Sequence, residues 1–346
     1  MTETSVRVVR DTGDLDVRAD MFRTVKVLMC RVHLRTVSIR AVPERFPCPP
    51  RFPVWSRRSE RGSRPTYPCR VDIPSVELSN GRSIPLVGLG TYNMLGRPCI
   101  GAVSAALKAG YRLLDTAPRY SNELSVGMGV HGSGIARDEV IVQTKLSGGD
   151  QGFDEAINAA KESARRLGVG YIDVYLIHWP CPSLGRTVDS WKALLTLADE
   201  GYVRTPGVSN FKPHQLQALF DETGRWPVLN QIQCSPALPR TELREFMAEK
   251  GIHAQAWHPT GRKEGVLGDP AILRIARKYG KSPTQVALRW AVQHGISVVP
   301  KSSHAGRQLE NADLFDFALD DADLADLASL DRGERAARDS DVDEEF

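Results

Sequence analysis

Four side chains able to move or stabilise a proton occur at or near the ends of short apolar runs. Asp115, Lys145 and His178 each end such a run, and Tyr120 follows the acid by five residues. A phenol is a poor acid at neutral pH unless a neighbouring cation stabilises its phenolate; Lys145 can supply that cation, and Asp115 can hold the lysine. His178 can donate a hydrogen bond to a carbonyl oxygen. Together these side chains predict proton delivery to a carbonyl as a hydride arrives.

The four residues are spread over an alternation of strand-like and helix-like segments that begins after residue 70. Short apolar runs predict eight strands, at residues 86–89, 111–115, 140–145, 171–178, 203–209, 229–233, 253–257 and 296–301. Amphipathic stretches predict the helices that follow them, at residues 102–108, 123–129, 153–167, 189–200, 212–221, 240–250, 270–279 and 320–330.

Eight strand–helix units over about 250 residues favour an α/β fold, a closed parallel (β/α)8 TIM barrel. A doubly wound open sheet is the alternative. It is disfavoured because Gly88-Leu89-Gly90 lacks the third glycine of a G-x-G-x-x-G motif. Since chemistry in a barrel takes place at the carboxyl ends of the strands, we expect the four side chains to meet at one mouth.

Other chemistries lack their sequence patterns. The eight histidines show no H-E-x-x-H or other paired ligand spacing, so we expect no metal. A G-x-S-x-G nucleophile motif is also absent. No stretch approaches the roughly 18 apolar residues of a membrane-spanning helix, and we expect no membrane association. The six cysteines include no C-x-x-C pair, which favours a reducing, cytoplasmic location.

Charge divides the chain in two. Residues 1–70 carry 14 Arg and one Lys against seven acids, whereas the remainder is net acidic. We expect residues 1–70 to be a disordered, basic, Pro/Arg-rich extension, and residues 71–346 to form the barrel domain. A nucleic-acid or lipid-binding arm is the alternative for the extension. It is disfavoured because clustered basic residues with interleaved aromatics are lacking. The acidic tail at residues 339–345 is expected to be a solvated end.

From about residue 71 to residue 332 the sequence resembles the aldo-keto reductase family, and within it the bacterial 2,5-diketo-gluconate reductase-like members. The matching motifs are Gly110-Tyr111-Arg112-Leu113-Leu114-Asp115-Thr116-Ala117, Tyr120-Ser121-Asn122-Glu123, Thr144-Lys145-Leu146, Tyr171-Ile172-Asp173-Val174-Tyr175-Leu176-Ile177-His178-Trp179-Pro180, Gly207-Val208-Ser209-Asn210-Phe211, Asn230-Gln231-Ile232 and Pro300-Lys301-Ser302.

The resemblance implies a monomeric reductase that uses NADPH on a small aldehyde or ketone. It implies that Tyr120 is the general acid, tuned by Lys145 and Asp115, and that His178 orients the carbonyl. The cofactor-binding residues that it implies are Gly90, Thr91, Tyr92, Ser209, Asn210, Gln231, Trp257, Lys301, Ser302, Ser303, Arg307, Glu310 and Asn311. Tyr92 and Trp179 are the expected walls of the substrate pocket.

Several positions depart from the family pattern. Ser147 replaces a frequent tryptophan after the third strand and is expected to widen the substrate pocket. His304 stands where Arg or Thr is frequent, so NADPH preference is expected to be weaker or sensitive to pH. An NADPH-binding sensor or partner-docking module without catalysis is the alternative function. It is disfavoured because a sensor needs none of the four proton-handling groups.

Overall fold

The computed structural model describes residues 71–261 and 265–345. The chain divides into two units, residues 1–63 and 64–346, and all of the described residues belong to the second. The predictions made for residues 1–70, both the extension and its basic-arm alternative, lie outside the described residues. Within the described residues no helix has the length and apolar character needed to cross a membrane.

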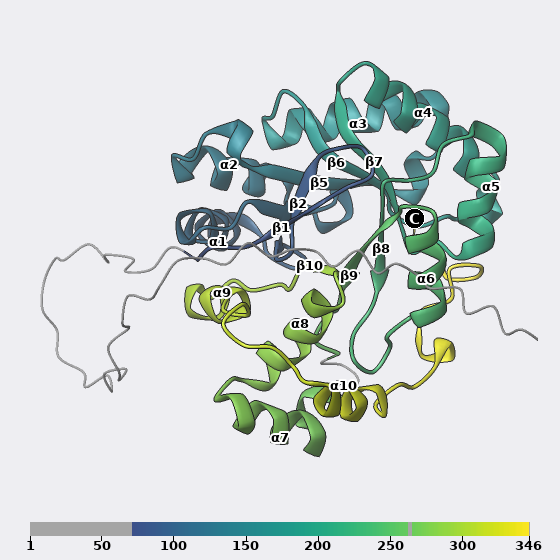
Figure 1. The fold of residues 1–346 in the computed structure, drawn as a ribbon. Helices are drawn as coiled ribbons and strands as arrows, with labels where there is room; N and C mark the ends of the chain where they lie inside the picture. The colour runs from purple at the N-terminus through teal and green to yellow at the C-terminus, as the bar shows by residue number, and fades with distance from the viewer. Residues whose placement is uncertain (1–70, 262–264, 346) are drawn as a thin grey trace, which may run out of the picture. The chain divides into compact units, whose positions relative to one another are not determined.

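The described residues form a parallel eight-stranded barrel, which confirms the predicted fold (Figure 1). Its strands are hydrogen-bonded in chain order: β3 (Leu89–Gly90), β4 (Leu113–Asp115), β5 (Ile141–Leu146), β6 (Ile172–Ile177), β7 (Val203–Ser209), β8 (Leu229–Gln233), β9 (His253–Trp257) and β10 (Ser297–Val298). Parallel bridges from Val87 to Val298 and from Gly90 to Lys301 join the first strand to the last and close the barrel.

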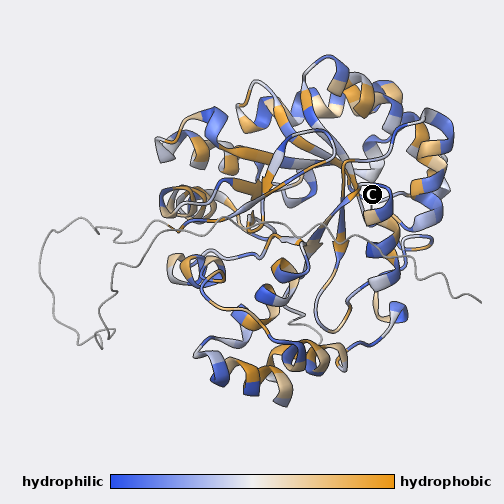
Figure 2. Ribbon diagram, viewed as in Figure 1, coloured by the Kyte–Doolittle hydropathy of each residue, from blue (hydrophilic) through white to orange (hydrophobic). Residues whose placement is uncertain are grey.

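Helices cover the outside of the barrel. They are α1 (Gly96–Ala109), α2 (Glu123–Ser133), α3 (Phe153–Leu167), α4 (Thr187–Asp199), α5 (Pro213–Thr223), α6 (Thr241–Glu249), α7 (Pro270–Tyr279), α8 (Pro283–Gln293), α9 (Ala305–Ala312) and α10 (Asp321–Ala328). Each helix shows hydrophobic and hydrophilic residues along its length in Figure 2, as expected for a layer between core and solvent. In α3 the predicted period is confirmed, because Ala156, Ala160, Ala164 and Leu167 are all buried.

A hairpin closes the amino-terminal end of the barrel. Strand β1 (Ser75–Glu77) pairs antiparallel with β2 (Ser83–Pro85). Leu78 and Ile84 from this hairpin pack against inward-facing side chains of the strands, including Leu113, Val174 and Leu229. That end is therefore filled by apolar side chains, and the polar residues at the carboxyl ends of the strands surround the open end.

Two helices differ from the sequence prediction. Helix α8 was not anticipated, although Ser282 and Gln285 form a capping box at its start and Pro283 occupies its first position. Helix α9 was also missed, because Leu309 is the only large apolar side chain among its eight residues. Both helices follow β9 in the chain, and α9 carries residues of the candidate site.

Candidate active site

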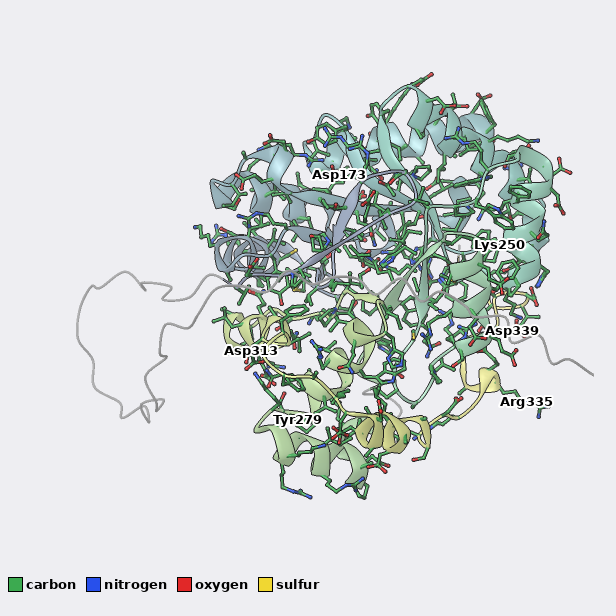
Figure 3. All side chains as sticks on the ribbon, in the orientation of Figure 1. Asp173, Lys250, Tyr279, Asp313, Arg335 and Asp339 are labelled. Carbon is green, nitrogen blue, oxygen red and sulfur yellow. The ribbon has the colours of Figure 1, made fainter. Side chains whose placement is uncertain are left out.

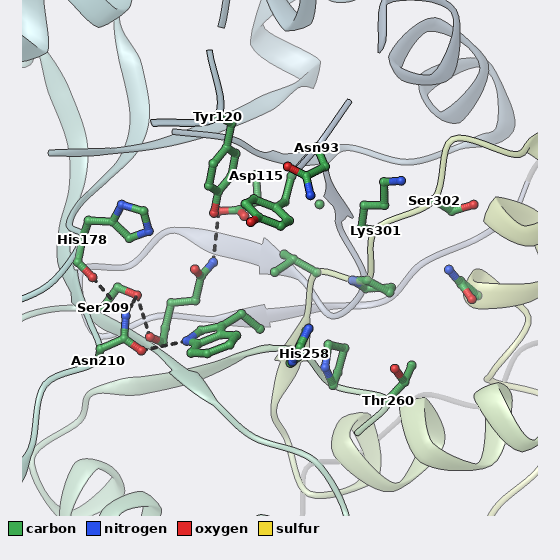
Figure 4. A pocket seen from close by; sticks show the side chains of 18 of the residues that line it. Asn93, Asp115, Tyr120, His178, Ser209, Asn210, His258, Thr260, Lys301 and Ser302 are labelled. Carbon is green, nitrogen blue, oxygen red and sulfur yellow. Dashed lines mark hydrogen bonds between the residues drawn. The ribbon is translucent and has the colours of Figure 1, made fainter. Parts of the chain in front are cut away.

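A cavity of about 900 Å³ opens at the carboxyl ends of the barrel strands (Figure 4). Its walls come from the ends of several strands and the loops that follow them, the position predicted for chemistry in this fold. Three of the four proposed catalytic residues line it, namely Asp115, Tyr120 and His178. Figure 4 shows these three side chains on the same side of the cavity, with Asn210 and Ser209 below them.

Lys145 lies behind this wall and is completely buried. Its Nζ donates hydrogen bonds to Oδ1 of Asp115 at 2.5 Å and to the backbone oxygen of Thr116 at 3.0 Å. Burial lowers the pKa of Lys145, and the adjacent Asp115 carboxylate opposes that shift. An ammonium ion in this position is thus stabilised chiefly by one carboxylate.

Tyr120 ends a short 3-10 turn (Pro118–Tyr120) that follows β4, and its ring stands in front of Lys145. The Lys145 Nζ lies 5.3 Å from the centre of the phenol ring. The pKa of Tyr120 is raised well above 10, first by burial and then by the carboxylates of Asp115 and Glu345. The phenol is therefore protonated at neutral pH. The sequence predicts that Lys145 lowers the pKa of this phenol, whereas in the structure burial and the carboxylates raise it.

His178 follows β6 directly and is 6% exposed. Its ring lies edge-on to Tyr120, with the ring centres 6.1 Å apart. Burial, Lys145 and nearby arginines together lower the pKa of His178 well below 6.5, so the imidazole is neutral. Its Nδ1 is buried without a hydrogen-bond partner, and its Nε2 lies 3.7 Å from Oε2 of Glu345.

Three buried glutamines inside the barrel form a hydrogen-bond network on Asp115. Gln143 Nε2 donates to Oδ1 of Asp115 at 2.6 Å, and Gln231 Nε2 donates to the same oxygen at 3.0 Å. Both amides also donate to Oε1 of Gln255, at 2.6 and 2.7 Å respectively. One oxygen of the Asp115 carboxylate therefore accepts hydrogen bonds from two amides and from Lys145. These bonds hold the carboxylate in place.

A second cluster joins the ends of β7, β8 and β9. Asn210 Nδ2 donates to the backbone oxygen of His178 at 3.0 Å and to Oγ of Ser209 at 3.1 Å, and its Oδ1 accepts from Trp257 Nε1 at 2.8 Å. Asn210 adopts a left-handed backbone conformation, with φ of 67°. Ser209 in turn donates to the backbone oxygen of Gln231 at 2.8 Å. The cluster fixes a polar floor beside His178.

The cavity extends from this floor to the loop after β10. Lys301, Ser302, Arg307 and Asn311 line that extension, which supplies two cations and two neutral donors. Glycine is needed at position 90, next to Lys301, because a Cβ atom there would collide with the backbone oxygen of Val299. This arm of the cavity can take a long ligand with an anionic end.

The C-terminal segment crosses the mouth of the cavity, contrary to the expectation of a solvated end. Lys212 pairs with Asp339 and Asp341, and Ser183 donates its backbone N–H to Glu344 at 2.7 Å. Figure 3 shows Arg335 and Asp339 on the segment that leads from α10 to this mouth. Glu345 is the last described residue and lies in the cavity wall.

The structure thus brings together most of the predicted site residues. Of the predicted cofactor residues, ten line the cavity: Gly90, Tyr92, Ser209, Asn210, Gln231, Trp257, Lys301, Ser302, Arg307 and Asn311. Three are absent from its lining: Thr91, Ser303 and Glu310. Thr91 is buried and donates to the backbone oxygen of Asp115, and Glu310 accepts a hydrogen bond from Ser282. Trp179 lines the cavity as predicted, and Arg338 packs over its ring at 4.4 Å.

Several lining residues were missed from sequence. They include Asn93, His258, Thr260, Thr284, Arg338 and Glu345. Asn93 follows Tyr92 and adopts a left-handed backbone conformation, with φ of 57°. Nothing in the sequence indicated that the C-terminal segment returns to the mouth of the cavity. Among the described residues no group of three or more His, Cys, Asp or Glu side chains could hold a metal ion.

Comparison with known proteins gives consistent matches over this part of the chain. The aldo/keto reductase family model matches residues 98–332. An aldo-keto reductase of Mycolicibacterium smegmatis is 45% identical over 266 residues, 77% of this chain and 96% of the relative. The 2,5-diketo-D-gluconic acid reductase B of a Corynebacterium species is 43% identical, over 80% of this chain and 99% of the relative. The crystal structure of a Gox0644 variant in complex with NADPH superposes with a TM-score of 0.75 at 38% identity, covering 79% of this chain and 99% of that one.

Proposed function

Because the chain belongs to the aldo/keto reductase family, we propose that it reduces an aldehyde or ketone to the alcohol, with Tyr120 as the proton donor. The chain is an oxidoreductase that uses NADPH, as supported by the family match and by the similar structure solved with NADPH. The observation that carries the assignment of roles is the placement of Tyr120 and His178 on one cavity wall, in front of the buried Lys145–Asp115 pair.

The cavity fits NADPH on the chemistry of its donors. Ser209, Asn210 and Gln231 offer neutral polar groups next to the catalytic wall, suited to a carboxamide, and Trp257 offers an aromatic face. Lys301 and Arg307 supply the cations that a phosphate monoester requires at the far end. When bound, the reduced nicotinamide supplies the hydride.

The amide nitrogen of Gln231 donates to Asp115 and Gln255, so its role toward the carboxamide falls to its oxygen atom. Ser303 and Glu310 are assigned to NADPH by the family resemblance alone. Thr91 acts through the backbone of Asp115, which its hydroxyl contacts.

His178 binds and orients the carbonyl oxygen. A neutral imidazole donates from one ring nitrogen only, and Nε2 is the nitrogen on the side of Glu345 and the cavity. A proton on Nε2 stabilises negative charge on the carbonyl oxygen as it develops, without taking part in proton transfer. We assign this tautomer from the required donor role.

Tyr120 donates the proton to the same oxygen. Its raised pKa keeps the phenol protonated in the resting chain. Transfer is still favourable, because an alkoxide is a stronger base than a phenolate. The phenolate that remains lies beside the Lys145 ammonium ion, whose charge stabilises it in the low-dielectric wall.

Turnover separates this function from a cofactor-binding sensor. The full chain is mixed with NADPH and a panel of small aldehydes and ketones, and the loss of the nicotinamide absorbance is followed. We expect steady reduction of at least the reactive aldehydes, with NADPH preferred over NADH. Tight binding of NADPH with no turnover of any carbonyl would support the sensor instead. We also expect a cytoplasmic monomer, which sedimentation of the purified chain tests for oligomeric state.

A further inference from the structure

The side chain of Glu345 occupies a cationic corner of the substrate end of the cavity. Its Oε2 lies 3.7 Å from Arg119 Nε and 3.7 Å from His178 Nε2, and its Oε1 lies 3.5 Å from Arg338 Nη1. Arg119 immediately precedes Tyr120, and Arg338 packs on Trp179. Two guanidinium groups therefore converge on one carboxylate next to the catalytic wall.

The contacts that Glu345 makes in this corner are long. All three separations exceed the 2.7–2.9 Å of a tight charge-assisted hydrogen bond, so Glu345 gains little from each contact. The carboxylate is delivered by an irregular segment after α10 and not by a strand or a helix. A free carboxylate of similar size can therefore compete with Glu345 for the same two arginines.

The backbone of Glu345 packs closely against Gly148. A Cβ atom at Gly148 would collide with the backbone oxygen of Glu345, whereas a Cβ atom at the adjacent Gly149 would meet nothing within 4 Å. Upstream, Glu344 is held by Ser183, and Asp341 accepts from Lys212 at 2.6 Å. Glu344 and Asp341 are thus held by residues outside the arginine corner, while Arg338 lies on the same segment and also pairs with Asp343 at 3.5 Å.

We propose that Arg119 and Arg338 form a carboxylate-binding subsite that Glu345 fills in the unliganded chain, and that the preferred substrates are carbonyl compounds bearing a carboxylate close to the carbonyl carbon. The inference rests on the proposed function, because the carbonyl must reach Tyr120 and His178. A single Glu345 oxygen is equally far from His178 and Arg119, so one small molecule can span from the carbonyl position to the arginines.

The test compares benzoylformate with its methyl ester, which differ in the charge of one group. For each variant the ratio of kcat/KM for the acid to that for the ester is measured with NADPH. Taking the ratio within each variant removes the intrinsic difference in electrophilicity between the two probes. We expect Arg338→Gln to lower this ratio about tenfold and Arg119→Gln to lower it in the same direction. Arg335→Gln, a change of the same kind on the nearby surface, should leave it within about twofold.

Two further variants test the role of Glu345. Glu345→Gln removes the competing charge, and Gly148→Ala displaces the backbone of the tail without changing any charge. Each is expected to raise kcat/KM for benzoylformate about threefold. Gly149→Ala is the matched control and should have no effect. An unchanged ratio in Arg338→Gln overturns the subsite, and no gain in both Glu345→Gln and Gly148→Ala overturns its occupation by Glu345.

A binding measurement keeps the subsite separable from the reaction. The dissociation constant of benzoylformate is measured by tryptophan fluorescence in the presence of NADP⁺, with no turnover required. Weaker binding in Arg338→Gln with no reduction of any carbonyl would uphold the subsite and reject the proposed function. Reduction of the ester with no binding of benzoylformate would uphold the function and reject the subsite.

Discussion

The Nζ atom of Lys145 lies 2.5 Å from Oδ1 of Asp115, and both side chains are buried, Asp115 in the lining of the cavity and Lys145 behind it. A buried charge pair of this kind keeps its geometry only when its remaining hydrogen-bonding capacity is satisfied. Here Gln143 and Gln231 add two amide donors to the same carboxylate oxygen. Asp115 is therefore held from three directions, and the lysine behind Tyr120 is held through it.

This arrangement predicts that Gln143 acts as a positioning residue. Gln143→Leu removes one donor to Asp115 and one to Gln255, so the carboxylate is less firmly fixed and Lys145 less well placed. We expect kcat to fall about tenfold while the dissociation constant for NADPH stays within twofold. Steady-state kinetics and cofactor titration measure the two quantities. An equal loss in both would indicate a general disturbance of the barrel.

The protonation states of Tyr120 and His178 predict a flat pH profile for reduction. The phenol loses its proton only above its raised pKa, and the imidazole gains one only below its lowered pKa. Neither group changes charge from about pH 6 to about pH 9, so kcat/KM for a neutral aldehyde should vary little over that range. A limb with a midpoint near neutrality would show that the bound cofactor resets one of these groups.

The cations at the far end of the cavity predict the choice of cofactor. Arg307→Gln removes a charge suited to a phosphate monoester, and we expect about tenfold weaker binding of NADPH. Binding of NADH, which lacks that phosphate, should change less than twofold. Arg277→Gln, on the exposed surface of α7, is the control. Equal weakening of both cofactors would place Arg307 away from the phosphate.

His253 predicts a loss of stability in acid. Burial lowers its pKa from 6.5 to about 4, and its Nε2 lies 2.8 Å from Ser297 Oγ. The unfolded chain then binds more protons than the folded chain between those two values. His253 therefore leaves the free energy of unfolding unchanged above pH 6.5 and lowers it as the pH falls toward 4, by about 3 kcal/mol.

Urea unfolding of His253→Gln at several pH values isolates this effect. The free energy of unfolding of the wild-type chain should fall more steeply between pH 6.5 and 4 than that of the variant. Parallel curves for the two proteins would mean that His253 titrates alike in the folded and unfolded chains.

The barrel and the convergence of Asp115, Tyr120, Lys145 and His178 were predictable because each depends on local sequence. Continuous apolar runs such as Ile172–Ile177 indicate buried strands, and the polar residue that ends each run lies at the mouth by the geometry of the fold. The glutamine network was not predictable. Gln143 and Gln255 lie on strands 112 residues apart in the chain, and each alone looks like an ordinary polar residue.

The path of the C-terminal segment could not be predicted from the sequence either. A run of acids usually indicates a solvated end, and here the run instead meets Lys212, Arg338 and Arg119 at the mouth. Those cations are spread over three separate segments, and only the folded barrel places them together. Burial and Asp115 raise the pKa of Tyr120 most, and Glu345 at the end of this path adds to the same shift.

The most direct test of the account is reduction of a reactive aldehyde by the wild-type chain and by Tyr120→Phe. The variant keeps the ring and removes only the donating hydroxyl, and NADPH binding measured alongside shows that the cavity is intact. We predict a loss of kcat of about 10² to 10⁴-fold, the usual contribution of a general acid, with the dissociation constant for NADPH unchanged. Wild-type turnover in Tyr120→Phe would contradict the assignment of Tyr120 as the proton donor.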